Sequence, residues 1–347
     1  IMHKAASGDP MPGTFAAEDE LFGLGRVLGD LGTGIFELAP VGSAGEDVLG
    51  ARQELDWMRR LSAEIGRPVS FAMLQVDAEP TLWKDMLEES KKALDEGADL
   101  WPQIAGRPFG MLVGHQTEYH PFADRPTYQK LKALPFDEMI ERLRDPETKK
   151  QILSEKVEYD DPMAAFVNSS IHKLFPLGPE CNYEPAPDES VAAMAEREGL
   201  SPEEMLYDLM LREDGRELLL FPLLNYSDGS CDPIYEMLHH PRAALGLGDG
   251  GAHCGIICDA SIQTFMLSHW VRDRKRGPKI PVELAVKRMS ADAADLYGLE
   301  DRGRLLPGYK ADVNLIDLDE VALQLPEMVF DLPAGGRRLI QKAKGYK

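Results

Sequence analysis

Apolar and polar residues alternate along the first hundred residues in a regular order of helices and strands. The predicted elements are a helix at 18–28, a strand at 34–38, a helix at 47–65, a strand at 69–74, a helix at 81–96 and a strand at 99–104. Apolar residues recur at helical spacing in the helices, whereas the strands are short apolar runs. This alternation indicates βαβ units and a parallel sheet, and it leaves open whether the sheet closes into a barrel.

The middle of the chain has no comparable periodicity. Residues 106–135 combine Gly, Pro, His and aromatic residues and predict a long loop, a place where substrate sites often form. Two charged helices are expected at 136–144 and 146–157. Four prolines between 174 and 189 exclude regular structure from most of that stretch, because proline lacks the backbone donor that helices and sheets need.

Regular elements return after residue 200. Ser201 followed by Pro202 and two glutamates is a strong helix start, with a side-chain cap and acidic residues in the first turn. Further elements are predicted as a strand at 218–221, a helix at 232–239, a strand at 243–247, and helices at 261–274 and 282–297. Residues 303–317 predict turns and short strands of a separate β element.

Composition narrows the class of protein. The 347 residues include 44% apolar and 28% charged residues, as in folded globular proteins, and no apolar run reaches the ~18 residues of a membrane helix. With 59 acidic against 38 basic residues, the net charge is −21, which disfavours nucleic acid as a partner. The four cysteines show neither zinc-finger spacing nor disulfide density, so a cytoplasmic setting is expected.

The clearest chemical motif is Gly-Asp-Gly-Gly-Ala-His at 248–253, directly after a predicted strand. Asp249 at such a strand end could bind a metal through one carboxylate oxygen and take a proton from bound water through the other. His253 follows four residues later. Alternatively, Asp249 caps the following helix and His253 fills space beside it.

A second pattern lies further on, and it points to a family. The arrangement A-x-x-x-G-L-x-x-R-G-x-L-x-P-G-x-x-A-D resembles the closing segment of the amidohydrolase superfamily, and its residues here are Ala294, Gly298-Leu299, Arg302-Gly303, Leu305, Pro307-Gly308 and Ala311-Asp312. Segments 12–21, 66–71 and 103–108 resemble its D-aminoacylase branch, the N-acyl-D-amino-acid deacylases of amidohydrolase family 3. The resemblance covers nearly the whole chain.

The resemblance implies an α/β fold, a (β/α)8 TIM-type barrel that is incomplete at its N-terminal side and followed by part of a small β-sandwich. Residues 1–302 would form the later strands of the barrel and 303–347 the start of the returning sandwich segment. It also implies that Asp249 is a catalytic residue and a metal ligand, and that His253 contacts substrate. The implied cofactor is Zn²⁺ or another divalent metal.

The implied reaction is hydrolysis of a carbon–nitrogen bond other than a peptide bond, in an N-acyl-D-amino acid. Zinc lowers the pKa of its bound water, the hydroxide attacks the acyl carbonyl, and Asp249 carries the proton to the leaving amine. A small-molecule substrate is therefore the expected partner, without nucleic acid or membrane, and homo-oligomerisation stays open. The alternatives are a cyclic amide, as for dihydropyrimidinase and dihydroorotase relatives, and a non-catalytic barrel that has lost its metal ligands.

The sequence also departs from the family pattern. It contains no H-x-H pair, which supplies the first metal ligands of the superfamily, and the predicted strands at 34–38 and 69–74 carry no histidine. Glu37 and Gln75 occupy plausible strand-end positions instead. We expect the chain to begin downstream of the strand that carries the H-x-H pair, with most metal ligands outside it.

The remaining histidines and cysteines have simpler interpretations. A structural or solvated role is favoured for His115 and His120, although their loop could also face substrate. His269 is expected to be a packing residue, and Cys254 and Cys258 are expected to be buried small apolar residues.

Overall fold

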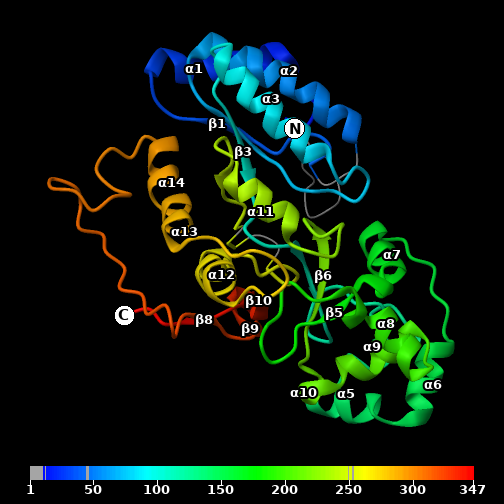
Figure 1. Ribbon diagram of the computed structural model, residues 1–347. Helices are drawn as coiled ribbons and strands as arrows, with labels where there is room; N and C mark the ends of the chain where they lie inside the picture. Colours follow the sequence, from blue (N-terminus) through cyan, green and yellow to red (C-terminus); the bar gives the residue numbers. More distant parts are fainter. Residues whose placement is uncertain (1–10, 12, 44–46, 249, 252–253) are drawn as a thin grey trace.

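The computed structural model describes residues 11, 13–43, 47–248, 250–251 and 254–347 (Figure 1). Asp249 and His253, the two predicted site residues, lie outside the described residues. No helix in the described part of the chain combines the length and the apolar character needed to cross a membrane.

A four-stranded parallel sheet forms the centre of the N-terminal part. Its strands are β1 (Phe36–Leu38), β2 (Val69–Ala72), β3 (Leu100–Ile104) and β7 (Ala244–Leu245), in that spatial order. Every neighbouring pair is parallel, with Leu38 opposite Phe71 and Gln103 opposite Ala244. The predicted α/β class with a parallel sheet is therefore confirmed.

Three helices lie together beyond one side of this sheet (Figure 1). They are α1 (Glu18–Leu31), α2 (Val48–Ile65) and α3 (Leu82–Asp95), each close to its predicted range. Met58 and Leu61 of α2 are fully buried in one core with Val69, Phe71 and Leu100 of the strands. Successive residues of a strand point to opposite faces of the sheet. The face that packs against the helices is apolar, and the polar residues between these apolar ones therefore lie on the other face.

The described residues show an open parallel sheet and no closed barrel, so the predicted barrel closure is not seen in them. After β3 the chain leaves the parallel sheet and returns to it only at β7. The intervening residues build a second sheet with a core of its own.

That second sheet is antiparallel and has the order β4-β6-β5. Its strands are β4 (Phe109–Val113), β5 (Phe175–Pro176) and β6 (Leu219–Leu224). The predicted strand at 218–221 is confirmed, but the prediction of a long loop at 106–135 is wrong, because β4 and α4 (Pro126–Leu131) lie within it. The strand β4 forms because it pairs with β6, which lies more than one hundred residues later in the chain. The apolar periodicity of residues 106–135 does not reveal a partner so distant in the sequence.

Side chains of β4 and β6 point alternately to the two faces of this sheet, so the sheet separates two hydrophobic cores. Leu112 and Leu220 face the core of the parallel sheet, whereas Met111, Leu219 and Phe221 belong to the core of the helical lobe. The lobe's helices are α5 (Phe136–Leu143), α6 (Pro146–Ser154), α7 (Pro162–Ser169), η1 (Ile171–Lys173), η2 (Pro187–Glu189), α8 (Val191–Glu198), α9 (Pro202–Met210) and α10 (Arg212–Gly215). Ser201 caps α9 as predicted, accepting from the Glu204 amide at 3.2 Å in a capping box.

The C-terminal third returns to the parallel sheet and ends in short strands. Its helices are α11 (Asp232–His239), α12 (Ile262–Phe265), the π-helix η3 (Met266–Asp273), α13 (Val282–Met289) and α14 (Ala291–Leu296). The strands β8 (Ala322–Leu323) and β11 (Ala343–Lys344) pair with each other, as do β9 (Glu327–Leu332) and β10 (Gly336–Ile340), with η4 (Pro333–Gly335) between the latter two. The division at residue 302 and the sandwich stay predictions.

Candidate active site at the carboxyl ends of the parallel strands

A row of polar side chains crosses the face of the parallel sheet opposite α2 and α3. Glu37 of β1, Ser70 of β2 and Gln103 of β3 make it, because each alternates along its strand with an apolar residue of the other face. Gln103 Nε2 donates to Glu37 Oε1 at 2.8 Å and to Ser70 Oγ at 3.0 Å. Tyr297, which follows α14, donates its hydroxyl to Glu37 Oε2 at 3.1 Å.

The three side chains of this row differ in how far they are buried. Ser70 and Gln103 are buried, whereas Glu37 is exposed at the edge strand of the sheet. A hydrogen-bonded side chain satisfies each of the two Glu37 carboxylate oxygens. The row is thus a preorganised polar surface that can orient a hydrogen-bonding ligand.

The strand β7 pairs with β3 and also ends at the carboxyl-end side of the sheet. The Gly246 amide donates to the Ile104 carbonyl at 3.0 Å, which extends the pairing with β3 past its last named residue. A Cβ on Gly246 would lie 2.6 Å from Gln103 Oε1, so any other residue here would require the Gln103 side chain to move. Leu247 then adopts a left-handed φ of 58°, an uncommon conformation for a non-glycine residue that often marks functional turns.

After the predicted motif, three other parts of the chain form backbone hydrogen bonds with residues 254–256. The Leu339 amide donates to the Cys254 carbonyl at 2.7 Å, and the Leu112 amide donates to the Ile256 carbonyl at 2.8 Å. The Glu118 amide donates to the Gly255 carbonyl at 3.3 Å. The segment after the motif is therefore fixed to β10, β4 and the chain that follows β4.

Arg107 organises the carboxyl end of β3 from the inside. Its side chain is 1% exposed, and its guanidinium pairs with Asp259 at 2.7 Å and donates to Ser261 Oγ at 3.0 Å and to the Cys258 carbonyl. The guanidinium also lies 3.9 Å from the centre of the Tyr183 ring. Arg107 thereby ties the end of β3 to the segment that follows the motif.

Sequence reasoning did not assign a role to Arg107. The residue stands in the Gly106-Arg107-Pro108 segment that carries the family resemblance, which was the one available signal. Its partner Asp259 lies 152 residues away in the chain, so no local pattern predicts the pair.

The described residues do not fit a metal centre. Among them, no three His, Cys, Asp or Glu side chains are placed to hold one metal ion. Glu37, the carboxylate of the polar row, is hydrogen-bonded through both of its oxygens. Gln75, the other strand-end candidate, donates through Nε2 to Asp228 and accepts from the Ser227 amide through Oε1.

The histidines of the middle segment form a buried pair against Tyr128. His115 Nδ1 lies 3.0 Å from the Tyr128 hydroxyl, and the rings of His115 and His120 are 5.7 Å apart. Burial lowers the pKa of His115 to about 3 and holds the pKa of His120 well below its usual value. Both rings are therefore neutral near pH 7, consistent with the favoured structural role.

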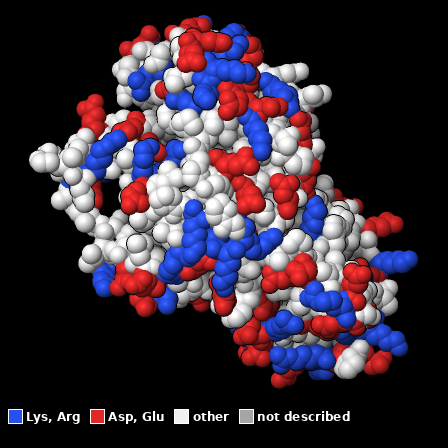
Figure 2. Space-filling view, in the orientation of Figure 1, with Lys and Arg blue, Asp and Glu red and all other residues white. Residues whose placement is uncertain are grey.

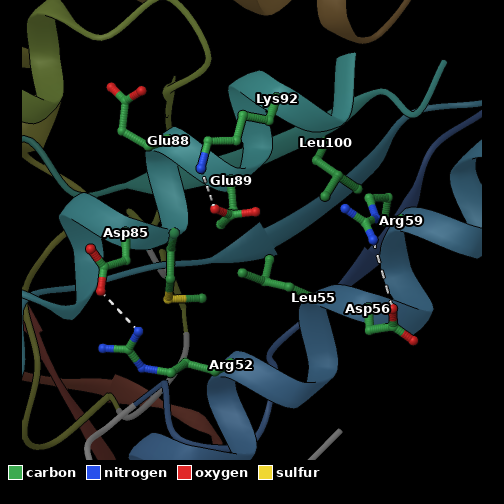
Figure 3. A pocket seen from close by; sticks show the side chains of 10 residues that line it. Arg52, Leu55, Asp56, Arg59, Asp85, Glu88, Glu89, Lys92 and Leu100 are labelled. Atoms are coloured by element: carbon green, nitrogen blue, oxygen red, sulfur yellow. Dashed lines mark hydrogen bonds and ion pairs between the residues drawn. The ribbon is translucent and has the colours of Figure 1, made fainter. Parts of the chain in front are cut away.

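A charged groove of about 500 Å³ lies between α2 and α3 and reaches Leu100 of β3 (Figure 3). Its side chains pair among themselves: Arg52 with Asp85 at 2.8 Å, and Lys92 with Glu89 at 2.7 Å. Arg59 also pairs with Asp56 at 3.9 Å across one turn of α2. Because these charges neutralise one another and are exposed, this groove provides no catalytic arrangement.

One of three comparisons with known proteins finds a match, and it covers most of the chain. The sequence model described as the amidohydrolase family matches residues 15–333. Searches among curated proteins and among solved structures give no match. The matched range includes the polar row, Arg107 and the motif at 248–253.

Proposed function

The chain belongs to the amidohydrolase family, and on that premise we propose that it hydrolyses the amide bond of an N-acyl-D-amino acid at the carboxyl ends of its parallel strands. One observation carries the choice of site: the polar row ending at Gln103 and the strand leading to Asp249 meet at one edge of the sheet. Parallel α/β enzymes place their reacting groups at that edge, beyond the carboxyl ends of the strands.

In this proposal Asp249 takes a proton from the attacking water and returns it to the leaving amine. The water oxygen bonds to the acyl carbon, the carbon–nitrogen bond breaks, and a carboxylate and a free amine leave. His253 contacts the substrate. Both roles rest on the family resemblance of the motif, because the two residues lie outside the described part of the chain.

Asp249 is the one residue that this proposal assigns as a zinc ligand. No cluster of three His, Cys, Asp or Glu side chains is placed to hold a metal among the described residues, so the metal requirement is tested apart from the reaction. We expect elemental analysis of the purified chain, before and after dialysis against a chelator, to find a divalent metal, and Asp249→Asn to lower its content.

The decisive assays measure release of free amine from N-acetyl-D-leucine and N-acetyl-L-leucine, and ring opening of the cyclic amide dihydrouracil to its N-carbamoyl amino acid. We expect the D-enantiomer to be hydrolysed fastest, and Asp249→Asn to lower the rate by about a hundredfold or more, as for loss of a general acid–base group. Asp30→Asn, in exposed α1, is the matched control and should leave the rate unchanged. Equal rates for the two variants would overturn the proposal.

A second candidate is a non-catalytic barrel, favoured because no three His, Cys, Asp or Glu side chains of the described residues are placed to hold one metal ion. It differs from the first in every readout: no divalent metal, no amine release and no effect of Asp249→Asn. A cyclic-amide hydrolase would instead bind metal and prefer dihydrouracil.

A further inference from the structure

A pocket of about 610 Å³ lies beside the π-helix η3. It is formed by η3 and the segment that follows it, by the irregular segment at 180–189 and by β8. Its volume is in the range of small-molecule sites. A π-helix is rare and is found mostly where function requires it.

Basic side chains concentrate on one stretch of this lining. The stretch contributes five of them: Arg272, Arg274, Lys275, Arg276 and Lys279. Figure 2 shows Lys and Arg side chains gathered over the region of α12 and η3. Such a concentration is unexpected in a chain with a net charge of −21.

Two of these cations are neutralised within the protein. Arg272 forms a bidentate pair with Asp273, with both contacts at 2.7 Å. Arg274 contacts Glu184 at 3.0 Å and Asp232 at 2.7 Å.

The other three cations form no ion pair with a carboxylate among the described residues, although Lys279 is close enough to Asp273 to help Arg272 lower the pKa of that carboxyl. Arg276 donates only to neutral oxygens: three backbone carbonyls and the Tyr226 hydroxyl. Lys279 donates to the Arg272 carbonyl, and Lys275 is exposed. A backbone carbonyl satisfies a donor but leaves its positive charge in place, so the charge remains available to an anion.

Carboxylates in the lining do not cancel this charge. Glu184 and Asp273 are already paired with arginines, and Glu189 accepts from the Ala186 amide at 2.5 Å. Glu180 is exposed. The lining as a whole therefore holds five basic side chains and four carboxylates, with the basic ones gathered on the 272–279 stretch.

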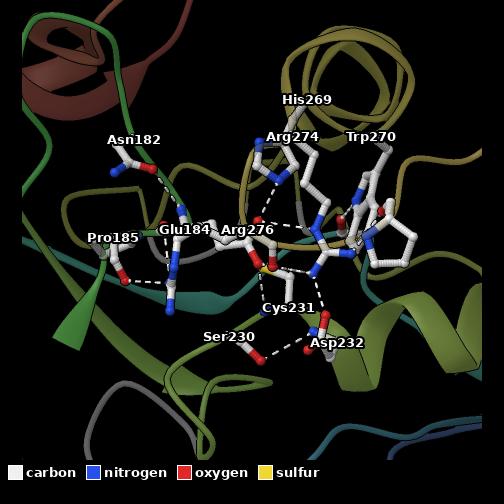
Figure 4. A network of polar contacts seen from close by, with 12 residues as sticks. Asn182, Glu184, Pro185, Ser230, Cys231, Asp232, His269, Trp270, Arg274 and Arg276 are labelled. Atoms are coloured by element: carbon white, nitrogen blue, oxygen red, sulfur yellow. Dashed lines mark hydrogen bonds and ion pairs between the residues drawn. The ribbon is translucent and has the colours of Figure 1, made fainter.

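Hydrogen bonds from three residues hold Glu184 in the lining of the pocket. Glu184 is 3% exposed and accepts from the Cys231 amide at 2.8 Å and from His269 Nε2 at 2.9 Å, besides its contacts with Arg274 (Figure 4). The His269 ring stacks on Phe265 at 4.3 Å. Its second ring nitrogen, Nδ1, points away from Glu184 (Figure 4), so an oriented imidazole edge completes the lining.

Apolar atoms also line the pocket. Phe265 lies under the imidazole, and Leu323 of β8 contributes a half-buried aliphatic side chain. We propose that this pocket binds a small organic anion, a carboxylate or phosphate group on a partly apolar body. Lys275, Arg276 and Lys279 hold the charge, and Phe265 and Leu323 contact the body.

The test is isothermal titration calorimetry on the full chain with benzoate, phenyl phosphate and the neutral benzamide at constant ionic strength. We expect saturable binding of at least one anion and none of benzamide; the preferred anion tells a carboxylate site from a phosphate site. No hydrolysis is measured, so the outcome is independent of the proposed activity.

Two double variants locate the site. Lys275→Gln/Lys279→Gln should weaken anion binding at least about tenfold, equivalent to about 1.4 kcal/mol. Lys91→Gln/Lys130→Gln removes the same charge from exposed positions in α3 and α4 and should bind as the wild type does. Absence of saturable binding by the wild type, equal binding of benzamide, or equal loss in both double variants would overturn the proposal.

Discussion

Glu184 gives the most quantitative prediction, because four donated hydrogen bonds meet on one buried carboxylate (Figure 4). Burial alone would raise its pKa, but the hydrogen bonds from His269, Arg274 and the Cys231 amide outweigh that effect and lower the pKa from 4.5 to about 2. At about 1.36 kcal/mol per pKa unit, this difference corresponds to about 3 kcal/mol of folding free energy.

Glu184→Gln keeps the shape of the side chain and removes its charge. We expect the variant to lose about 3 kcal/mol at pH 7, the lower end of the cost of breaking a buried pair, since Asp232 still lies beside Arg274. Glu64→Gln is the matched control: its pair with Arg26 is exposed, and its loss should cost less than about 1 kcal/mol.

The pH dependence has a definite sign. The folded pKa of Glu184 lies below the unfolded value, so the stabilisation is complete above pH 4.5 and is lost as the pH falls toward 2. The gap between wild type and Glu184→Gln should therefore narrow in acid, by up to about 1.4 kcal/mol per pH unit. Urea unfolding followed by circular dichroism at pH 7 and at about pH 3.5 measures both quantities. A variant as stable as Glu64→Gln at pH 7, or a gap that does not change in acid, would refute the reasoning.

Three further predictions concern the buried groups and one close backbone approach. The pKa of His115 is lowered to about 3 and that of His120 well below its usual value, so the unfolded chain binds more protons below pH 6.5; urea midpoints should fall between pH 7 and 5, and less so in His115→Asn. Arg107→Met should cost about 3–5 kcal/mol in urea unfolding, because a buried ion pair is broken, whereas Arg59→Met, in an exposed pair, should cost less than about 1 kcal/mol. Gly110→Ala should cost about 1–3 kcal/mol in the same assay, because its Cβ would lie 2.1 Å from the Phe221 carbonyl oxygen in the paired strand β6.

Each of these has a clear contrary result. Equal acid sensitivity of the wild type and His115→Asn would show that the buried pair does not control the response between pH 7 and 5. Equal losses for the two arginine variants would contradict a buried, charge-bearing role for Arg107. Gly23→Ala, at an exposed α1 position where a Cβ meets nothing within 4 Å, should instead stabilise by about 0.5–1 kcal/mol, and a destabilisation like that of Gly110→Ala would contradict the steric argument.

The sequence by itself determined the parallel α/β part and many helix limits. The helix predicted at 232–239 is α11 (Asp232–His239), and the predicted start at Ser201 is the cap of α9. These features come from neighbouring residues: apolar spacing, a capping side chain, or a proline at the first turn. The predicted helix at 282–297 divides at Ser290, whose φ of −128° and ψ of −72° are not helical.

Only the tertiary structure decided which distant residues meet. Gln103 and Glu37 are 66 positions apart, His269 and Glu184 are 85 apart, and Arg107 and Asp259 are 152 apart. His269 does pack on Phe265, as expected of a packing residue, but its pairing with a buried carboxylate has no local signal. Periodicity reports which face of an element is apolar, whereas a contact across the chain depends on how the elements pack, and that arrangement brings the polar row together and surrounds Glu184 with its donors.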